Sequence, residues 1–432
     1  MKKAVFLIFL SLLISQNVVS QTKQKVFTAD ISNFWKAFDL IRITKDYSEK
    51  IRIINELYID KGSKGLKAFM QSRNYTDTLY VKQIEDYPKF WSSIRQNALR
   101  IEDKVPEIEN AIINFRKLYP QLKEAEIYFT IGGMKSGGTI KDNMVLVGCE
   151  VATGDRNVDV SELQDDWLKS IFEKEAIDVV ALNIHEYVHT QQKSSRQQVL
   201  AHSIHEGACD FITELVLGKT LNTRYLVYGK QNAEKVKHDF KREMFTDNFR
   251  NWLYNGSFGV EMPDLGYYVG YDICKRYYEQ ATDKTKAIAE IIELDVANSK
   301  EVKAFLNKSG YFEEKINERK LIKAYEANIP FVKSIAPFKN GAKDVPDKLE
   351  ILKIVFSREM DTKVSINFSK RGKEHFPLKK IIGFESDKKT LLLALDLKAK
   401  TNYDFTITDR STKSADGYML KTSEFQVTFT TK

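Results

Sequence analysis

Apolar residues recur every three or four positions between residues 30 and 122, the spacing that gathers them on one face of a helix. Phe34, Phe38 and Ile41 form one such set. Several of these runs follow a polar residue of the kind that caps helix N-termini. The pattern predicts a predominantly helical N-terminal region.

Two short segments then depart from helical spacing. Residues 125–131 and 144–148 are rich in β-branched and aromatic side chains, and Gly132-Gly133 closes the first segment. We expect two short strands joined by a glycine-rich turn. Helical spacing returns in further segments, which run from Trp167 to His189, from Gln197 to Leu217, and in pieces from Ala233 to about Tyr325.

The pattern changes again after residue 328, where prolines and a glycine precede short strand-like runs separated by polar turns. Short strands at this spacing are typical of a sandwich. The chain is therefore predicted to be α+β. We expect a mostly helical domain at residues 21–333, a linker at 334–347 and an all-β sandwich at 348–432.

The N-terminus reads as a secretory signal peptide over residues 1–20, with Lys2 and Lys3 before an apolar stretch and small residues before the cut. An uncleaved anchor is the alternative, but the apolar run is shorter than the ~20 residues that a spanning helix needs. No cysteine lies near the predicted cleavage site, which argues against a lipid-modified N-terminus. We expect a mature chain without a transmembrane segment, secreted or held in the periplasm or cell envelope.

Charge and cysteine content narrow the functional classes. The formal charge of +8 falls to +6 without Lys2 and Lys3, and no long Lys/Arg block is present, so nucleic acid is not an expected partner. The cysteines are Cys149, Cys209 and Cys274. This odd, scattered set leaves one disulfide possible but does not indicate a cysteine-ligated zinc site.

The segment most indicative of chemistry is His185-Glu186-Tyr187-Val188-His189. Two histidines four residues apart on a helix point from one face and can bind one metal ion. The glutamate lies about 100° around the helix, where it can reach a metal-activated water. The segment predicts a Zn²⁺ site with Glu186 as general base and acid.

The next helical segment supplies a third ligand. Glu206 and Asp210 are four residues apart, and 16 residues separate His189 from Glu206, enough for a loop and a return. We expect Glu206 to bind the metal and Asp210 to accept the free ring N–H of a ligand histidine. His202 and His205 remain alternatives for the third ligand.

With these residues the chain resembles the gluzincin peptidases, whose pattern is His-Glu-x-x-His followed by Glu-x-x-x-Asp, although the interval before Glu206 is slightly shorter here. It also looks similar to predicted bacterial zinc peptidases that include relatives of gliding-motility lipoproteins. That resemblance covers roughly residues 118–278. It rests on the metal motif together with Gly132-Gly133, Ser136-Gly137-Gly138-Thr139, Glu206-Gly207-Ala208-Cys209-Asp210 and Gly266-Tyr267-Tyr268-Val269-Gly270-Tyr271. The resemblance implies a zincin-like peptidase domain.

Two further features have both a functional and a structural interpretation. The glycines at 132, 133, 137 and 138 would let an extended peptide add to a strand, or would simply form a turn. Tyr267, Tyr268 or Tyr271 would donate a hydrogen bond to the oxyanion of the reaction, or would only pack in the core.

The C-terminal segments 356–361 and 425–431 resemble bacterial Ig-like domains of the S-layer type. The resemblance implies spacing, or contact with a cell surface or polysaccharide, rather than catalysis.

Taken together, the sequence predicts a secreted zinc metallopeptidase that acts on a peptide or protein. A zinc-containing binding or assembly protein of the cell envelope without turnover is one alternative. A zinc amidase with a non-peptide substrate is another.

Overall fold

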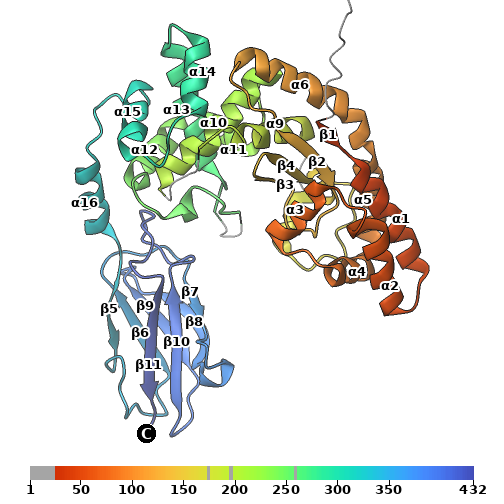
Figure 1. Cartoon of the computed structure of the whole chain (residues 1–432). Coiled ribbons are helices and arrows are strands. Elements are labelled where there is room, and N and C mark those ends of the chain that lie inside the picture. Colours follow the sequence, from red (N-terminus) through yellow and green to blue (C-terminus); the bar gives the residue numbers. More distant parts are fainter. Residues whose placement is uncertain (1–24, 173–175, 194–197, 257–259) are drawn as a thin grey trace, which may run out of the picture.

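The computed structural model describes residues 25–172, 176–193, 198–256 and 260–432 (Figure 1). The predicted signal peptide lies outside the described residues. The chain is α+β, with a mainly helical part followed by a part built of β-sheets, as the hydrophobic pattern predicts.

The N-terminal region is helical and surrounds an aromatic core. Phe34, Tyr58 and Trp91 are fully buried there, and the ring centroids of Phe34 and Trp91 lie 5.0 Å apart. The helices are α1 (Ala29–Ile43), α2 (Tyr47–Ile54), α3 (Lys64–Arg73), α4 (Asp77–Asp86), α5 (Pro88–Leu99) and α6 (Val105–Leu118), with a π-helical turn at Asn55–Ile59 and a 3₁₀ turn at Arg100–Lys104.

A four-stranded sheet has the order β1-β2-β4-β3. Strand β1 (Val26–Phe27) precedes α1, whereas β2 (Glu126–Thr130), β3 (Gly138–Lys141) and β4 (Met144–Gly148) follow α6. The expected pair of strands is present, but β2 and β4 run parallel, and β3 lies between them in sequence and pairs antiparallel with β4. The sequence hides β3 because all four of its residues are half-buried and show no alternation. Strand β3 forms an edge of the sheet.

The remaining helices of this part carry and surround the metal motif. They are α7 (Cys149–Ala152), α8 (Asp166–Phe172), α9 (Val179–His189), α10 (Val199–Leu217), α11 (Arg224–Gln231), α12 (Ala233–Glu243), α13 (Leu265–Gln280), α14 (Lys284–Ile292), α15 (Ser299–Lys308) and α16 (Glu318–Asn328), with a 3₁₀ turn at Phe249–Asn251.

The single helical run expected from Trp167 to His189 is two helices. Asp178 begins the second one, because its carboxylate accepts the backbone N–H groups of Val180 and Ala181, each at 3.1 Å. Helix α9 therefore starts only three turns before His189, and α8 is a separate element.

Helices α10 and α13 cross in direct backbone contact. A Cβ on Gly207 would lie 2.0 Å from the backbone nitrogen of Tyr271, and a Cβ on Gly270 would lie 1.6 Å from the carbonyl oxygen of Ser203. Glycine is required at both positions for this close approach. The crossing brings the start of α13 beside the residues that α10 contributes to the candidate site.

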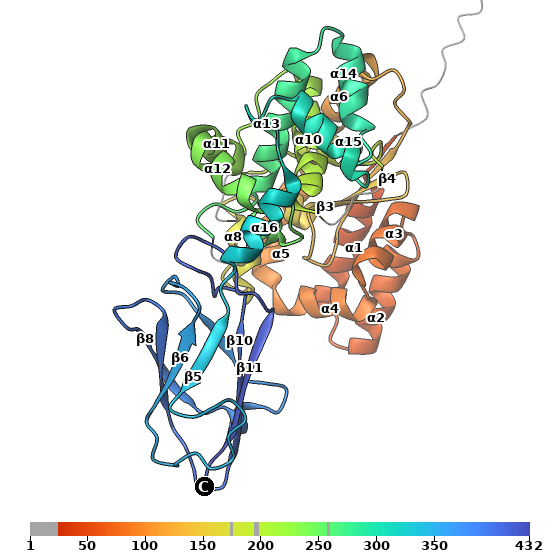
Figure 2. The ribbon, with the colours of Figure 1, turned by 90° about the vertical axis from the view of Figure 1, so that its left-hand side faces the viewer.

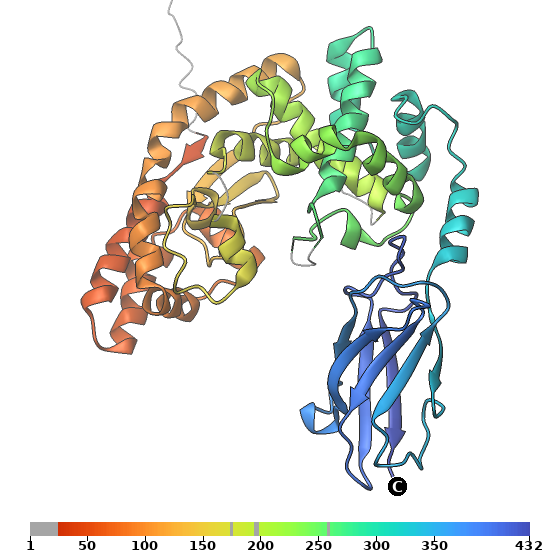
Figure 3. The same cartoon turned by 180° about the vertical axis from the view of Figure 1, so that it is seen from behind.

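The C-terminal part is a sandwich of two antiparallel sheets with one core (Figure 3). Leu352, Phe405 and Val427 are fully buried in it. One sheet has the order β5-β6-β9-β8 and the other β11-β10-β7. The strands are β5 (Val332–Ala336), β6 (Ile351–Phe356), β7 (Ser365–Asn367), β8 (Leu378–Phe384), β9 (Thr390–Leu395), β10 (Asn402–Thr408) and β11 (Glu424–Thr430), with a 3₁₀ turn at Lys373–His375.

The apolar pattern predicts strands at residues 349–356, 364–368, 390–397, 403–408 and 425–429, but it does not predict β5 or β8. Strand β5 spans the expected boundary at residue 334 and extends into the segment taken as a linker. Strand β8 is an edge strand whose pairing with β9 shifts register twice, so its exposed and buried positions do not alternate. Edge strands with bulges lose the period of two on which the sequence-based prediction depends.

The sandwich lies below the helical part in Figure 2 and contacts it through α12 and the segment after it. Arg242 donates a hydrogen bond to the carbonyl oxygen of Asp416 at 2.8 Å, and its guanidinium lies 4.8 Å from the ring centroid of Tyr418. Arg250 pairs with Asp409. Within the described residues, none of the helices has the length and apolar character needed to cross a bilayer.

Candidate metal centre

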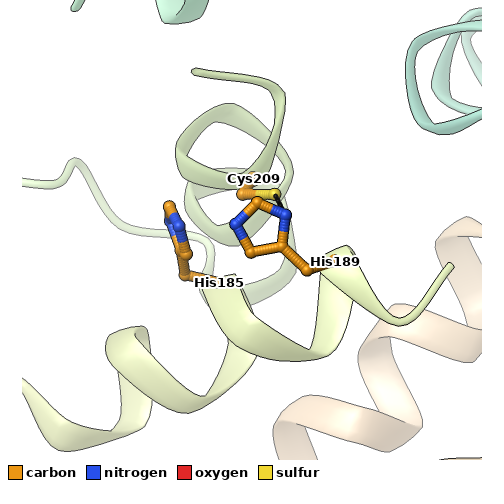
Figure 4. A group of neighbouring side chains, drawn as sticks. All are labelled: His185, His189 and Cys209. Carbon is orange, nitrogen blue, oxygen red and sulfur yellow. Dashed lines mark hydrogen bonds between the residues drawn. The ribbon is translucent and has the colours of Figure 1, made fainter. Parts of the chain in front are cut away.

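Helix α9 presents His185 and His189 from one face, with ring centroids 5.0 Å apart (Figure 4). Asp178 caps its first turn, and near its other end the hydroxyl of Tyr187 accepts the backbone N–H of Ala125 at 2.8 Å. Both ends of the helix are thus fixed, one by its cap and the other by the segment that leads into β2.

Glu206 from α10 meets both imidazoles. Its Oε2 lies 3.5 Å from Nε2 of His185 and 3.2 Å from Nε2 of His189. Burial would raise the pKa of Glu206, but the two imidazoles outweigh it and hold that pKa well below its ordinary value. The carboxylate is therefore ionised, and three potential donor atoms face one another.

The other ring nitrogen of each histidine, Nδ1, has its own hydrogen-bond partner. Nδ1 of His185 lies 2.8 Å from Oδ1 of Asp210, and Tyr225 donates a hydrogen bond to the second oxygen of that carboxylate at 3.0 Å. Nδ1 of His189 lies 2.7 Å from Oε1 of Gln192. The amide nitrogen of Gln192 donates to the carbonyl oxygen of residue 205 at 2.8 Å, which orients the amide.

These partners determine the tautomers. The carboxylate of Asp210 and the amide oxygen of Gln192 can only accept, so Nδ1 of each histidine carries the hydrogen. Hydrogen-bond partners of metal-binding histidines commonly fix the orientation of the ring in this way. Asp210 lies at the position that the sequence predicts for such a partner. Burial lowers the pKa of each histidine, but the neighbouring carboxylates outweigh it and raise that pKa, so each Nε2 also carries a proton and faces Glu206 as a donor. A metal ion that binds there would displace these protons, because a histidine ligand must be neutral.

Cys209 is a second possible partner of the two histidines (Figure 4). Its sulfur lies 3.3 Å from Nδ1 of His189, the nitrogen that already faces Gln192, and not on the side of Nε2. Burial also raises the pKa of the Cys209 thiol well above its ordinary value, whereas metal binding requires a thiolate. Glu206 therefore fits as third donor better than Cys209.

The two alternative histidines, His202 and His205, lie beside the site. Nε2 of His202 lies 3.1 Å from the hydroxyl oxygen of Tyr254. The ring of His205 packs 5.0 Å from that of His189, and burial lowers the pKa of His205 to about 3, so its imidazole is neutral.

Glu186 faces the edge of the sheet. Its Oε1 lies 3.1 Å from the position that a Cβ would occupy on Gly138, at the start of β3. Any side chain at residue 138 would press on this carboxylate. Gly138 thus leaves the space between Glu186 and the edge strand open.

Of the three tyrosines considered from sequence, the structure brings Tyr267 to the histidines. Its ring is stacked over His185 with centroids 6.1 Å apart and planes 22° apart. Tyr268 is buried instead against Gly229, where a Cβ would lie 2.2 Å from its ring. The hydroxyl of Tyr271 donates to Glu214 at 2.7 Å. Neighbouring residues of a helix point about 100° apart, which separates Tyr268 from Tyr267.

Tyr254 is a contact that the sequence did not reveal. Its hydroxyl donates a hydrogen bond to Oε1 of Glu206 at 2.6 Å, and its backbone N–H donates to Oδ1 of Asp264 at 2.8 Å. The residue adopts a left-handed φ of 54°. No spacing rule links position 254 to α10, so only the tertiary fold shows this contact.

Gln192 was also not predicted as part of the site, although it lies three residues after His189, a spacing at which helical side chains are neighbours.

The three cysteines are buried and free, so the possible disulfide is absent. Gly132 is held by Glu150, which accepts its backbone N–H at 2.8 Å.

Solved structures that match the chain include two surface-layer proteins, described as the S-layer protein rSbsC(31-844) and surface layer protein SbsC, domains 1-6. Each is 11% identical over 93% of this chain and 44% of that chain, with a TM-score of 0.19. The chain spans less than half the length of either, and a TM-score this low supports no argument. No curated protein matches.

A family model described as gliding motility protein GldB matches residues 16–255. The match covers the sheet, α9, α10 and the segment that carries Tyr254, and it ends before the β-sandwich. The model is one of lipoproteins, which associates the chain with the cell envelope. Because the match extends over more than half of its length, the chain belongs to the gliding motility protein GldB family.

Proposed function

We propose that the chain is an exported zinc-dependent peptidase, with His185, His189 and Glu206 as metal ligands and Glu186 as general base and acid. The observation that carries the proposal is the convergence of both Nε2 atoms on Oε2 of Glu206, while Asp210 and Gln192 hold the Nδ1 atoms.

The donor set fits Zn²⁺. Two imidazole nitrogens and one carboxylate oxygen are ligands that catalytic zinc uses, and three protein ligands leave a position open. When bound, zinc would lower the pKa of a water molecule and polarise a scissile carbonyl group. A buried, oriented and ionised set of this kind is costly for a fold to maintain without an ion.

The residues around the donors have roles that follow from their positions. Glu186, between the histidines and β3, would accept a proton from the attacking water and pass it to the leaving amine. An extended peptide would pair with the free edge of β3, with Gly138 leaving room beside Glu186. Tyr267, stacked over His185, is the proposed donor to the oxyanion, and Tyr268 is not proposed for that role.

The test is a comparison of the wild-type protein with Glu186→Gln. The wild type, supplied with zinc, should cleave members of a mixed peptide pool. The variant should lose activity by about 10²- to 10⁴-fold, as expected for loss of a general base, while it retains zinc. Cleavage at the wild-type rate by the variant would remove Glu186 from the mechanism, and a wild type without hydrolysis would refute the peptidase.

The family description names a motility protein and no reaction, which is the ground for a second candidate. This candidate is a zinc-containing binding or assembly protein of the cell envelope without turnover. It predicts bound zinc and no hydrolysis in the same experiment. A zinc amidase with a non-peptide substrate predicts hydrolysis of other amides. The predicted Ig-like character of the sandwich, and its contact with a surface or polysaccharide, stay predictions.

A further inference from the structure

Arg73, the last residue of α3, lies at the start of the edge strand. Its Nη2 donates a hydrogen bond to Oγ of Ser136 at 3.4 Å, and Ser136 in turn donates to the carbonyl oxygen of Gly138 at 2.7 Å. Gly138 is the residue that faces Glu186. The guanidinium is therefore two hydrogen bonds away from the residue that borders the proposed catalytic base.

Among the described residues, this guanidinium has no counter-ion. No carboxylate within the described ranges lies at ion-pair distance from Arg73, although Lys64, on the same helix, pairs with Glu126. The Nε atom of Arg73 is buried and has no hydrogen-bond partner. A buried, unsatisfied donor on a charged group is costly, and a ligand that accepts from it would recover that cost.

A second cation lies beside the first. Nζ of Lys135 is 3.5 Å from the carbonyl oxygen of Arg73 and 5.7 Å from the ring centroid of Tyr75. In the part of the chain that the structure describes, Lys135 likewise has no carboxylate at ion-pair distance. Two positive charges with no counter-ion among the described residues thus flank one end of β3.

Resting on the proposed peptidase function, we infer that Arg73 and Lys135 form a subsite for a carboxylate side chain of the substrate. A peptide paired with β3 advances about 3.3 Å per residue, and its side chains alternate between the faces of the sheet. An Asp or Glu a few residues from the scissile bond would then reach the planar guanidinium, which can bind both carboxylate oxygens. The substrate class is an acidic peptide.

The subsite is tested by binding, so that it does not depend on turnover. The protein is the zinc-loaded Glu186→Gln chain, and the probes are two fluorescein-labelled peptide pools that differ only in Glu or Gln at fixed positions. Fluorescence anisotropy should show that the Glu pool binds about tenfold more tightly, and that added salt reduces the difference.

Arg73→Gln, introduced into that chain, should abolish the preference and leave binding of the Gln pool within about twofold. Arg73→Glu should favour a pool with Lys at the same positions. Arg42→Gln, at an exposed arginine of α1, is the matched control for net charge and should keep the preference. Thermal unfolding of each variant verifies the fold.

Equal binding of the two pools, no binding of either pool, or a preference that survives Arg73→Gln would overturn the subsite. A wild type that binds the Glu pool through Arg73 but cleaves nothing would support the subsite and refute the peptidase.

Discussion

Two buried glutamates of the helical part have opposite pKa shifts. Glu206 in α10 faces two imidazoles, which hold its pKa well below the ordinary value. Glu150 in α7 accepts backbone N–H groups from Gly132 at 2.8 Å and Met134 at 2.9 Å, and burial raises its pKa to about 7 despite these bonds. Both side chains are almost inaccessible.

The difference shows that burial of a carboxyl group does not by itself mark a site. Glu150 accepts hydrogen bonds from backbone N–H groups of the loop that leads to β3. These hydrogen bonds do not prevent protonation of Glu150 near neutral pH. Glu206 is kept ionised by groups that are themselves oriented by Asp210 and Gln192. Convergence of oriented nitrogen and oxygen atoms, rather than burial, distinguishes the candidate metal centre.

The same substitution at the two glutamates should separate their roles. Glu206→Gln replaces an anionic ligand with a neutral amide and should weaken zinc binding by more than about a hundredfold, since loss of even an outer partner weakens it by 10- to 100-fold. Competition with a zinc chelator measures this loss. Glu150→Gln is the control and should retain wild-type zinc affinity. Equal losses of zinc affinity in the two variants would show that the two glutamates do not differ in metal binding.

Tyr254 contacts Glu206 through one hydrogen bond, so removal of the Tyr254 hydroxyl should have a smaller effect than replacement of Glu206. Tyr254→Phe should lower kcat/KM for peptide cleavage by about tenfold, the value of one hydrogen bond to a charged group, while the zinc content stays unchanged. Tyr268→Phe, at a tyrosine buried against Gly229, should leave kcat/KM unchanged. Identical kinetics of the two variants would deny Tyr254 a part in the site.

Glu150 should have its effect on stability rather than on metal binding. Its pKa in the folded chain, about 7, exceeds the ordinary value of 4.5, so the folded state retains a proton that the unfolded state releases between these values. Its contribution to the free energy of unfolding therefore falls by about 3 kcal/mol between pH 4.5 and pH 7 and is constant above that range.

Urea unfolding at pH 5 and pH 8 tests this expectation. The free energy of unfolding of the wild type should fall between pH 5 and pH 8 because Glu150 loses its proton. Glu150→Gln should lack this part of the decrease. A pH dependence shared by the variant and the wild type would show that the Glu150 carboxyl does not titrate in this range.

The parts of the fold that were predictable are those with strong periodicity. The buried faces of α1 and α10 and strands such as β9 follow from spacing of three to four or from dense apolar runs. The edge strands β3 and β8 were not predictable, because a half-buried or bulged edge has no clear alternation.

At the site, local spacing on α9 and α10 places His185, His189, Glu206 and Asp210, whereas the contacts made by Tyr254, Tyr225 and Arg73 come from distant segments. The position of Tyr267 over His185 depends on the crossing of α10 with α13, which requires glycine at both contact points. A single sequence gives the periodicity of a helix but not which helix it crosses.

The most direct test of the central claim is the zinc content of the purified wild-type chain beside His185→Ala and His202→Ala, determined by atomic emission. The proposed ligand set predicts one zinc per wild-type chain, loss of zinc in His185→Ala, and full zinc in His202→Ala, whose ring faces Tyr254. A wild type without stoichiometric zinc, or loss of zinc in His202→Ala with retention in His185→Ala, would contradict it.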